Sequence, residues 1–101
     1  MGLFDFVIDI RIKKLKRYIA NGAVLLDVRN KDEIKNGKIE GSLNIPFDDL
    51  QDGVDELKKM KKPIIVHCES GGRSAKAAQY LTLNNIDAVN GGSWKNLKKL
   101  L

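Results

Sequence analysis

Two short apolar runs that contain β-branched residues constrain the fold of this chain more than any other feature. They are AVLLDV at residues 23–28 and PIIVHC at residues 63–68. Both are nearly continuous in apolar character, as expected of strands that are covered on both faces of a sheet. Helix-patterned segments separate them from each other and from the rest of the chain. Because strands that alternate with helices are typical of a parallel α/β sheet, we expect that architecture here.

Three weaker segments complete the expected sheet. SLNIP at 42–46 and DAVNG at 87–91 have the composition of shorter strands, and FVIDI at 6–10 is a candidate first strand. Helices are expected at 11–22, 31–36, 49–60, 73–84 and 93–101. The pattern therefore predicts up to five strands in one α/β unit.

The length of 101 residues suits one domain with a modest core, so we interpret residues 1–101 as a single domain. One cysteine cannot form an internal disulfide, and nothing requires an oxidising compartment; we expect a cytoplasmic protein. Residues 1–10 are apolar, but Asp5 and Asp9 interrupt them, they lack the flanks of a signal peptide, and they are too short to span a membrane. We therefore expect no membrane partner.

The formal net charge of +5 arises largely from three basic clusters. These are KKLKR at 13–17, KKMKK at 58–62 and KNLKK at 95–99. Leu or Met interrupts each cluster at helical spacing, which is typical of the solvated face of an amphipathic helix. Aromatic residues that would stack on bases are absent from the clusters. We expect no nucleic-acid partner, although the positive field favours small anions.

The single cysteine lies in HCESGGRSAKAA, residues 67–78, where a buried strand ends and a helix begins. Cys68 is therefore expected at the carboxyl end of a parallel strand, the edge where open α/β sheets bind ligands. The helix amino terminus offers free amides and a positive dipole end, and both favour a thiolate. Gly71 and Gly72 let the loop turn its amides inward, and Arg73 adds a positive charge. We interpret Cys68 as a catalytic nucleophile rather than a small buried residue.

Polar neighbours of this loop are expected to support it. His67 precedes Cys68 on the strand and points to the opposite face, so a core or hydrogen-bonding role is favoured over a catalytic one. Asp27 and Arg29 end the other central strand at the same sheet edge; a supporting ion pair is favoured over substrate binding. Glu33 is either a further ion-pair partner or part of a solvated helix face. Ser74 either donates a hydrogen bond to the sulfur or occupies the first helical turn.

Four motifs, taken together, resemble a known family. They are LLDVRNKDEI at 25–34, GKIEGSLNIP at 37–46, CESGGRSAKAAQYL at 68–81 and NGGSW at 90–94. In this order they are similar to the motifs of a single-domain rhodanese, with the likeness running from residue 23 to residue 94. The resemblance implies a rhodanese-like three-layer sandwich: a five-stranded, mostly parallel sheet with helices on both faces. It also implies a cysteine that carries sulfur as a persulfide.

The chain departs from the family pattern in three places. Lys38 occupies a position where the family often has histidine, and Trp94 follows Gly92 sooner than in the usual carboxyl-terminal motif. Glu69 places a carboxylate beside the nucleophile, where the best-known thiosulfate enzymes of the family have basic residues. This carboxylate opposes binding of dianionic thiosulfate unless Arg73 and nearby lysines outweigh it.

The function expected from these motifs is a sulfurtransferase of the thiosulfate type. Cys68 takes sulfane sulfur from a small anionic donor such as thiosulfate and passes it to an external thiol, including a protein thiol, or to cyanide. The loop residues Glu69, Ser70, Gly71, Gly72 and Arg73 bind donor and persulfide. No cofactor is expected, and one cysteine beside one histidine lacks the companion ligands of a metal site.

Two alternatives remain open at this stage. The segment from His67 to Ser74 resembles the loop of cysteine phosphatases and arsenate reductases, but four residues separate Cys68 from Arg73 where those enzymes have five. The shorter loop suits one terminal sulfur better than a tetrahedral oxyanion. The other alternative is a rhodanese-like module for protein binding or sulfur relay. Loss of the cysteine is the usual mark of the non-catalytic modules, and Cys68 is present.

Overall fold

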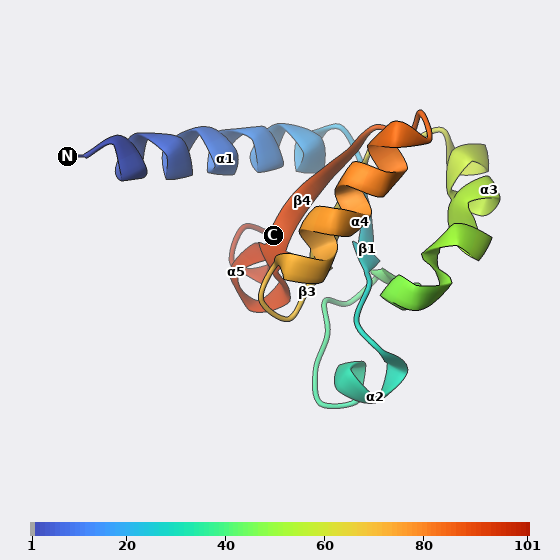
Figure 1. Ribbon diagram of the computed structural model, residues 1–101. Helices are drawn as coiled ribbons and strands as arrows, with labels where there is room; N and C mark the ends of the chain where they lie inside the picture. Colours follow the sequence, from blue (N-terminus) through green and yellow to red (C-terminus); the bar gives the residue numbers. More distant parts are fainter. Residues whose placement is uncertain (1) are drawn as a thin grey trace.

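The computed structural model describes residues 2–101. Its strands are β1 (Val24–Asp27), β2 (Leu43–Asn44), β3 (Ile64–Cys68) and β4 (Ala88–Ser93). Its α-helices are α1 (Leu3–Ala20), α2 (Lys31–Ile34), α3 (Leu50–Met60), α4 (Gly72–Leu83) and α5 (Trp94–Lys98), and a 3-10 turn at Phe47–Asp49 precedes α3. The elements alternate along the chain as the sequence pattern predicts (Figure 1).

The strands form one sheet in the order β2-β1-β3-β4, and every pair is parallel. Parallel pairing brings the carboxyl ends of all these strands to the same edge. All five residues of the central strand β3 are buried, which accounts for its apolar sequence. Its two faces support two separate cores, so the architecture is the expected three-layer sandwich.

The core on one face joins the sheet to α3 and α4. Its buried side chains include Leu26 and Val66 from the strands, Leu57 from α3 and Leu81 from α4. The core on the other face is smaller and joins Ile65 to side chains of α1 and α5. Ser93 is the N-cap of α5, and its Oγ accepts a hydrogen bond from the backbone N of Asn96 at 3.2 Å. This side chain therefore satisfies one of the free amides at the start of the helix.

The expected fifth strand is wrong. Within the described residues the sheet has four strands, and residues 6–10 lie inside α1. Residues 3–20 contain neither Gly nor Pro, so no residue type interrupts a helix that starts early. Ile8, Ile12 and Leu15 also continue one helical stripe from the apolar half into the basic half. A short β-branched run does not by itself distinguish a strand from the first turns of such a helix.

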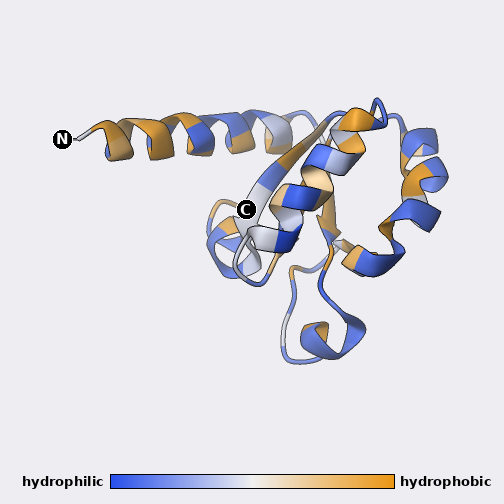
Figure 2. Ribbon diagram, in the orientation of Figure 1, coloured by the Kyte–Doolittle hydropathy of each residue, from blue (hydrophilic) through white to orange (hydrophobic). Residues whose placement is uncertain are grey.

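The amino-terminal half of α1 extends beyond the sheet (Figure 1) and is largely apolar (Figure 2). Phe4 and Phe6 are 75% and 61% exposed, whereas Leu15, further along the helix, is buried against the sheet. Within residues 2–101, α1 and the other helices all lack the combination of length and apolar character needed to cross a membrane. Only the second half of α1 thus contributes to the core.

Candidate active site

Cys68 ends β3, and its sulfur lies within the turn that leads into α4. The side chain is 1% exposed. Sγ accepts hydrogen bonds from the backbone N of Gly71 at 3.1 Å and from the backbone N of Ser74 at 3.4 Å. The hydroxyl oxygen of Ser74 lies 3.2 Å from the same sulfur. The sulfur therefore lies where donors from the loop and from the first turn of α4 converge.

These donors favour the ionised form of the cysteine. Burial raises the pKa of the Cys68 thiol, but hydrogen bonds from the Ser74 hydroxyl and from the backbone N atoms of Ser74, Gly71 and Ser70 outweigh burial, and the net pKa is lowered. A lowered pKa increases the thiolate fraction near neutral pH. The expectation of a reactive sulfur at this position thus has a structural basis.

Gly71 allows the loop to close tightly around the sulfur. Its φ of 102° lies in the left-handed region that favours glycine. A Cβ at this position would also lie 3.4 Å from Cα of Gly92 on β4. Gly72 begins α4, and the positive end of the helix dipole faces the loop. Backbone conformation therefore favours glycine at Gly71, whereas a Cβ at Gly72 would meet no atom within 4 Å.

Asn90 of β4 is a site residue that sequence reasoning missed. Its Oδ1 accepts hydrogen bonds from Ser74 Oγ at 2.7 Å and from the backbone N of Gly92 at 2.9 Å, and its Nδ2 donates to the backbone O of Gly71 at 3.4 Å. These contacts fix the orientation of the amide. The available signal was a polar residue within a strand, directly before two glycines.

The Ser74 hydroxyl faces two acceptors with one hydrogen. When that hydrogen points to Asn90 Oδ1, the Cys68 thiol can donate to Ser74 Oγ. When Cys68 is ionised, the sulfur has no hydrogen to give, and Ser74 stabilises it only by turning its own hydrogen toward Sγ. The direction of the Ser74 hydroxyl hydrogen, toward Asn90 Oδ1 or toward Sγ, therefore depends on whether Cys68 is ionised.

Arg73 forms an ion pair at the rim of the loop. Its Nη1 donates to Glu33 Oε1 at 2.6 Å, and its Nη2 donates to Glu33 Oε2 at 2.9 Å. This contact holds the pKa of Glu33 at about 2 and raises the pKa of Arg73. Glu33 is thus an ion-pair partner rather than part of a free helix face. Any anion that binds Arg73 would share its guanidinium with this carboxylate.

Asp27 and Arg29 form the buried support expected from their positions. Each is 1% exposed, and the Asp27 carboxylate accepts from Arg29 Nε, Arg29 Nη2 and the Arg29 backbone N. Although burial acts to raise the pKa of Asp27, the adjacent His67 imidazole and the hydrogen bonds from Arg29 hold it well below its usual range. His67 is fully buried, with Nε2 3.5 Å from Asp27 Oδ2. These three residues fix the ends of β1 and β3.

The Glu69 carboxylate contacts Arg29 and Trp94. Its Oε2 accepts a hydrogen bond from Trp94 Nε1 at 3.0 Å and lies 3.4 Å from Arg29 Nη1. The Arg29 guanidinium also lies over the Trp94 ring, 4.7 Å from its centroid. The carboxylate that the sequence places beside Cys68 therefore has a cation and an indole donor as partners, which offset its charge.

The chain belongs to the rhodanese-like domain family. The family model described as Rhodanese-like domain matches residues 11–99. An uncharacterised Bacillus subtilis protein, YqhL, is 39% identical over 67 residues, which cover 66% of this chain and 52% of that protein. The chain thus spans about half the length of this relative. Thiosulfate sulfurtransferase GlpE of Shewanella oneidensis is 31% identical over 70 residues, covering 69% of this chain and 68% of the relative.

Solved structures agree with the family assignment. A rhodanese-related protein from Thermoplasma volcanium has a TM-score of 0.72 at 30% identity, with 87% of this chain and 88% of that chain covered. The human single-domain sulfurtransferase TSTD1 has a TM-score of 0.66 at 28% identity, with 86% and 91% covered. At the family level, these likenesses support a sulfurtransferase-type enzyme.

Proposed function

We propose that this protein transfers sulfane sulfur from a donor such as thiosulfate, through a persulfide on Cys68, to an external thiol or to cyanide. The observation that carries the proposal is the set of donors around Sγ, which favours a thiolate at the end of a strand. The family of the chain and its sulfurtransferase relatives support the reaction class. The small anionic donor and the external acceptor are part of the proposal.

In the first step the Cys68 thiolate attacks the outer sulfur of thiosulfate. A new S–S bond forms, the original S–S bond breaks, and sulfite leaves with the electron pair. The persulfide then carries its negative charge on the terminal sulfur. Backbone N–H groups of the loop from Glu69 to Arg73 stabilise that charge, because they are already ordered before the reaction.

In the second step an acceptor thiolate or cyanide attacks the terminal sulfur. The S–S bond breaks, its electron pair returns to Cys68, and the thiolate is ready for another donor. The sequence has one cysteine, so the acceptor sulfur comes from another molecule. Ping-pong kinetics are therefore expected. A cytoplasmic location is part of the same proposal, since a free catalytic thiol suits a reducing compartment.

Arg73 and Glu69 tune donor binding in this proposal. Arg73 attracts the anionic donor, and Glu33 offsets part of that charge. Glu69 repels the donor less than an unpaired carboxylate would, because Arg29 and Trp94 bind it. Replacement Glu69→Gln should then change the KM for thiosulfate by less than about threefold, a range expected for a solvent-screened pair. A larger change would show that Glu69 controls donor choice.

Intact-protein mass spectrometry tests the proposal most directly. Incubation with thiosulfate should add one sulfur, about 32 Da, and cyanide should remove it with formation of thiocyanate. The Cys68→Ser variant should gain no mass and form no thiocyanate. The proposal fails if no sulfane donor yields an adduct, and it names the wrong nucleophile if Cys68→Ser remains active.

Two further measurements test the role of Arg73 and the class of reaction. Arg73→Ala should reduce turnover more than it reduces the free energy of unfolding; normal turnover with a large loss of stability would make Arg73 structural. Hydrolysis of an aryl phosphate faster than sulfur transfer would instead favour the phosphatase alternative. Each assay uses the full chain and the same Cys68→Ser control.

A further inference from the structure

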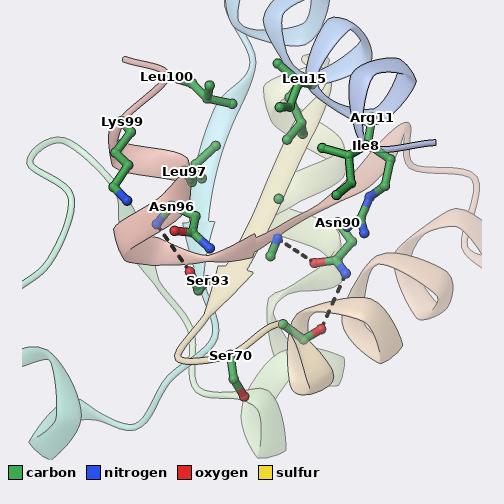
Figure 3. A pocket seen from close by; sticks show the side chains of 14 residues that line it. Ile8, Arg11, Leu15, Ser70, Asn90, Ser93, Asn96, Leu97, Lys99 and Leu100 are labelled. Carbon is green, nitrogen blue, oxygen red and sulfur yellow. Dashed lines mark hydrogen bonds between the residues drawn. The ribbon is translucent and has the colours of Figure 1, made fainter. Parts of the chain in front are cut away.

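A groove of about 580 Å³ lies beside the Cys68 loop, between α1, β4 and α5. One end is formed by Ser70 and Gly71, so it reaches the loop whose Gly71 amide binds the sulfur. Figure 3 shows Ile8, Arg11 and Leu15 of α1 on one side of the groove and side chains of α5 on the other, with β4 between them. Beyond the loop residues at this end, the catalytic steps above do not use this space.

The floor of the groove is the open edge of the sheet. Among residues 2–101, β4 is the terminal strand of the sheet and pairs with β3 on one side only. Residues 90–93 of this strand line the groove; Gly91 is buried, whereas Asn90, Gly92 and Ser93 are partly exposed. Backbone groups along an open strand edge are suited to bind an extended peptide by strand addition.

The walls of the groove combine apolar side chains with positive charge. Ile8, Ile12, Leu15, Leu97 and Leu100 supply the apolar surface. Arg11 and Lys99 supply the charge, and both residues are exposed. Among the described residues that line the groove, none is acidic. An occupant that complements this surface carries apolar side chains and carboxylates.

The size of the groove also favours a large occupant. A volume of several hundred Å³ accommodates a drug-sized molecule or several peptide residues. Cyanide and thiosulfate each occupy a small part of it. The groove therefore fits an acceptor, or part of one, that is much larger than the small molecules of a standard sulfurtransferase assay.

We propose that this groove docks an extended, acidic segment of a protein that accepts sulfur from Cys68. The inference rests on the proposed function and specifies its acceptor. The segment lies along β4, its carboxylates face Arg11 and Lys99, and its cysteine reaches the loop at Ser70. The partner thiolate attacks the terminal sulfur of the Cys68 persulfide. The S–S bond breaks, its electron pair returns to Cys68 Sγ, and the partner cysteine keeps the transferred sulfur together with the negative charge on that sulfur.

Docking can be measured without sulfur chemistry. The probe is a short, fluorescently labelled peptide of leucines and glutamates with one serine in place of the reactive cysteine. Fluorescence anisotropy should show saturable binding to the full chain, and replacement of every glutamate by glutamine should weaken it about tenfold, through loss of charge pairing. Equal affinity for the two peptides, or no binding of either, would overturn the proposal.

Charge-reversal variants locate the binding surface. Arg11→Glu combined with Lys99→Glu should weaken binding of the glutamate peptide about tenfold or more, because two attractive charges become repulsive. The matched control, Lys58→Glu with Lys62→Glu, makes the same change in net charge at exposed positions outside the groove, and it should change binding by less than about twofold. A loss in the control as large as that in the groove variant would indicate non-specific charge attraction and contradict a docking site.

Nuclear magnetic resonance then tests the role of the strand edge. Titration with the glutamate peptide should shift the backbone amide signals of residues 90–93 more than those of α3. Shifts that concentrate on α3 would refute docking along β4. Failure of these binding experiments leaves the persulfide mass experiment unaffected, so the docking proposal and the proposed function can fail separately.

Discussion

Removal of the Ser74 hydroxyl should reduce the thiolate fraction of Cys68. In Ser74→Ala, Sγ keeps the backbone N donors of Gly71 and Ser74 and loses the hydroxyl 3.2 Å away. A hydrogen bond to a charged group contributes about 1.5–3 kcal/mol, and sulfur is a weak acceptor, so the lower value applies. About 1.5 kcal/mol corresponds to about a tenfold fall in thiolate population at a pH below the midpoint of the parent protein.

The rate of alkylation by iodoacetamide, measured as a function of pH, reports this population. One cysteine in the sequence means that every alkylation event is at Cys68. The profile of Ser74→Ala should move to higher pH, because the pKa that Ser74 helps to lower is no longer lowered as far. Ser70→Ala is the matched control, since it removes a hydroxyl from the same loop and keeps the backbone amide.

Asn90→Ala provides a second test with the opposite sign. Asn90 Oδ1 competes for the single Ser74 hydroxyl hydrogen, so its removal leaves Sγ as the acceptor and should move the profile to lower pH. The reasoning is refuted if Ser74→Ala leaves the alkylation profile unchanged. A move to higher pH in Asn90→Ala would show that Asn90 supports the thiolate rather than competing with it.

Other substitutions test the residues that support the site, and for each the free energy of unfolding is measured in urea. Asp27→Ala leaves the buried Arg29 without its main partner and should cost about 3 kcal/mol or more; a loss below about 1 kcal/mol would mean that the pair is dispensable. Gly91→Ala places a Cβ 2.6 Å from Ile65 Cγ2 and should cost about 1–3 kcal/mol, and an unchanged stability would show that the strands separate easily. Because the pKa of Glu33 is lowered from 4.5 to about 2, its ion pair stabilises the fold fully above pH 4.5 and progressively less as the pH falls toward 2. Glu33→Gln should remove this pH dependence, which contributes less than about 1 kcal/mol to the free energy of unfolding because the pair is partly exposed. If stability falls between pH 4.5 and pH 2 as it does in the parent protein, Glu33 is not the source of the loss.

The expected position of residues 6–10 shows one limit of sequence reasoning. FVIDI is apolar and β-branched, and these properties suit a strand as well as a helix that continues the stripe of Ile12 and Leu15. The choice depends on what lies beside the segment after folding. In the structure the segment is helical, and no strand of the described residues pairs with the outer edge of β4. This difference creates the groove, which no local pattern indicated.

The sequence by itself determined the parallel α/β architecture, the place of Cys68 at the end of a central strand, and the family. The first two follow from local patterns: apolar runs, helical stripes and a Gly-Gly-Arg loop between a strand and a helix. The family follows from the resemblance of four motifs in their order along the chain. Only the tertiary structure decided how the charges and hydrogen bonds around that cysteine are arranged. Glu33 and Arg73 are 40 residues apart, as are Arg29 and Glu69, and both pairs meet because the sheet brings strand ends together. Such long-range partners depend on side-chain geometry across the folded chain, for which spacing along a single sequence carries no signal.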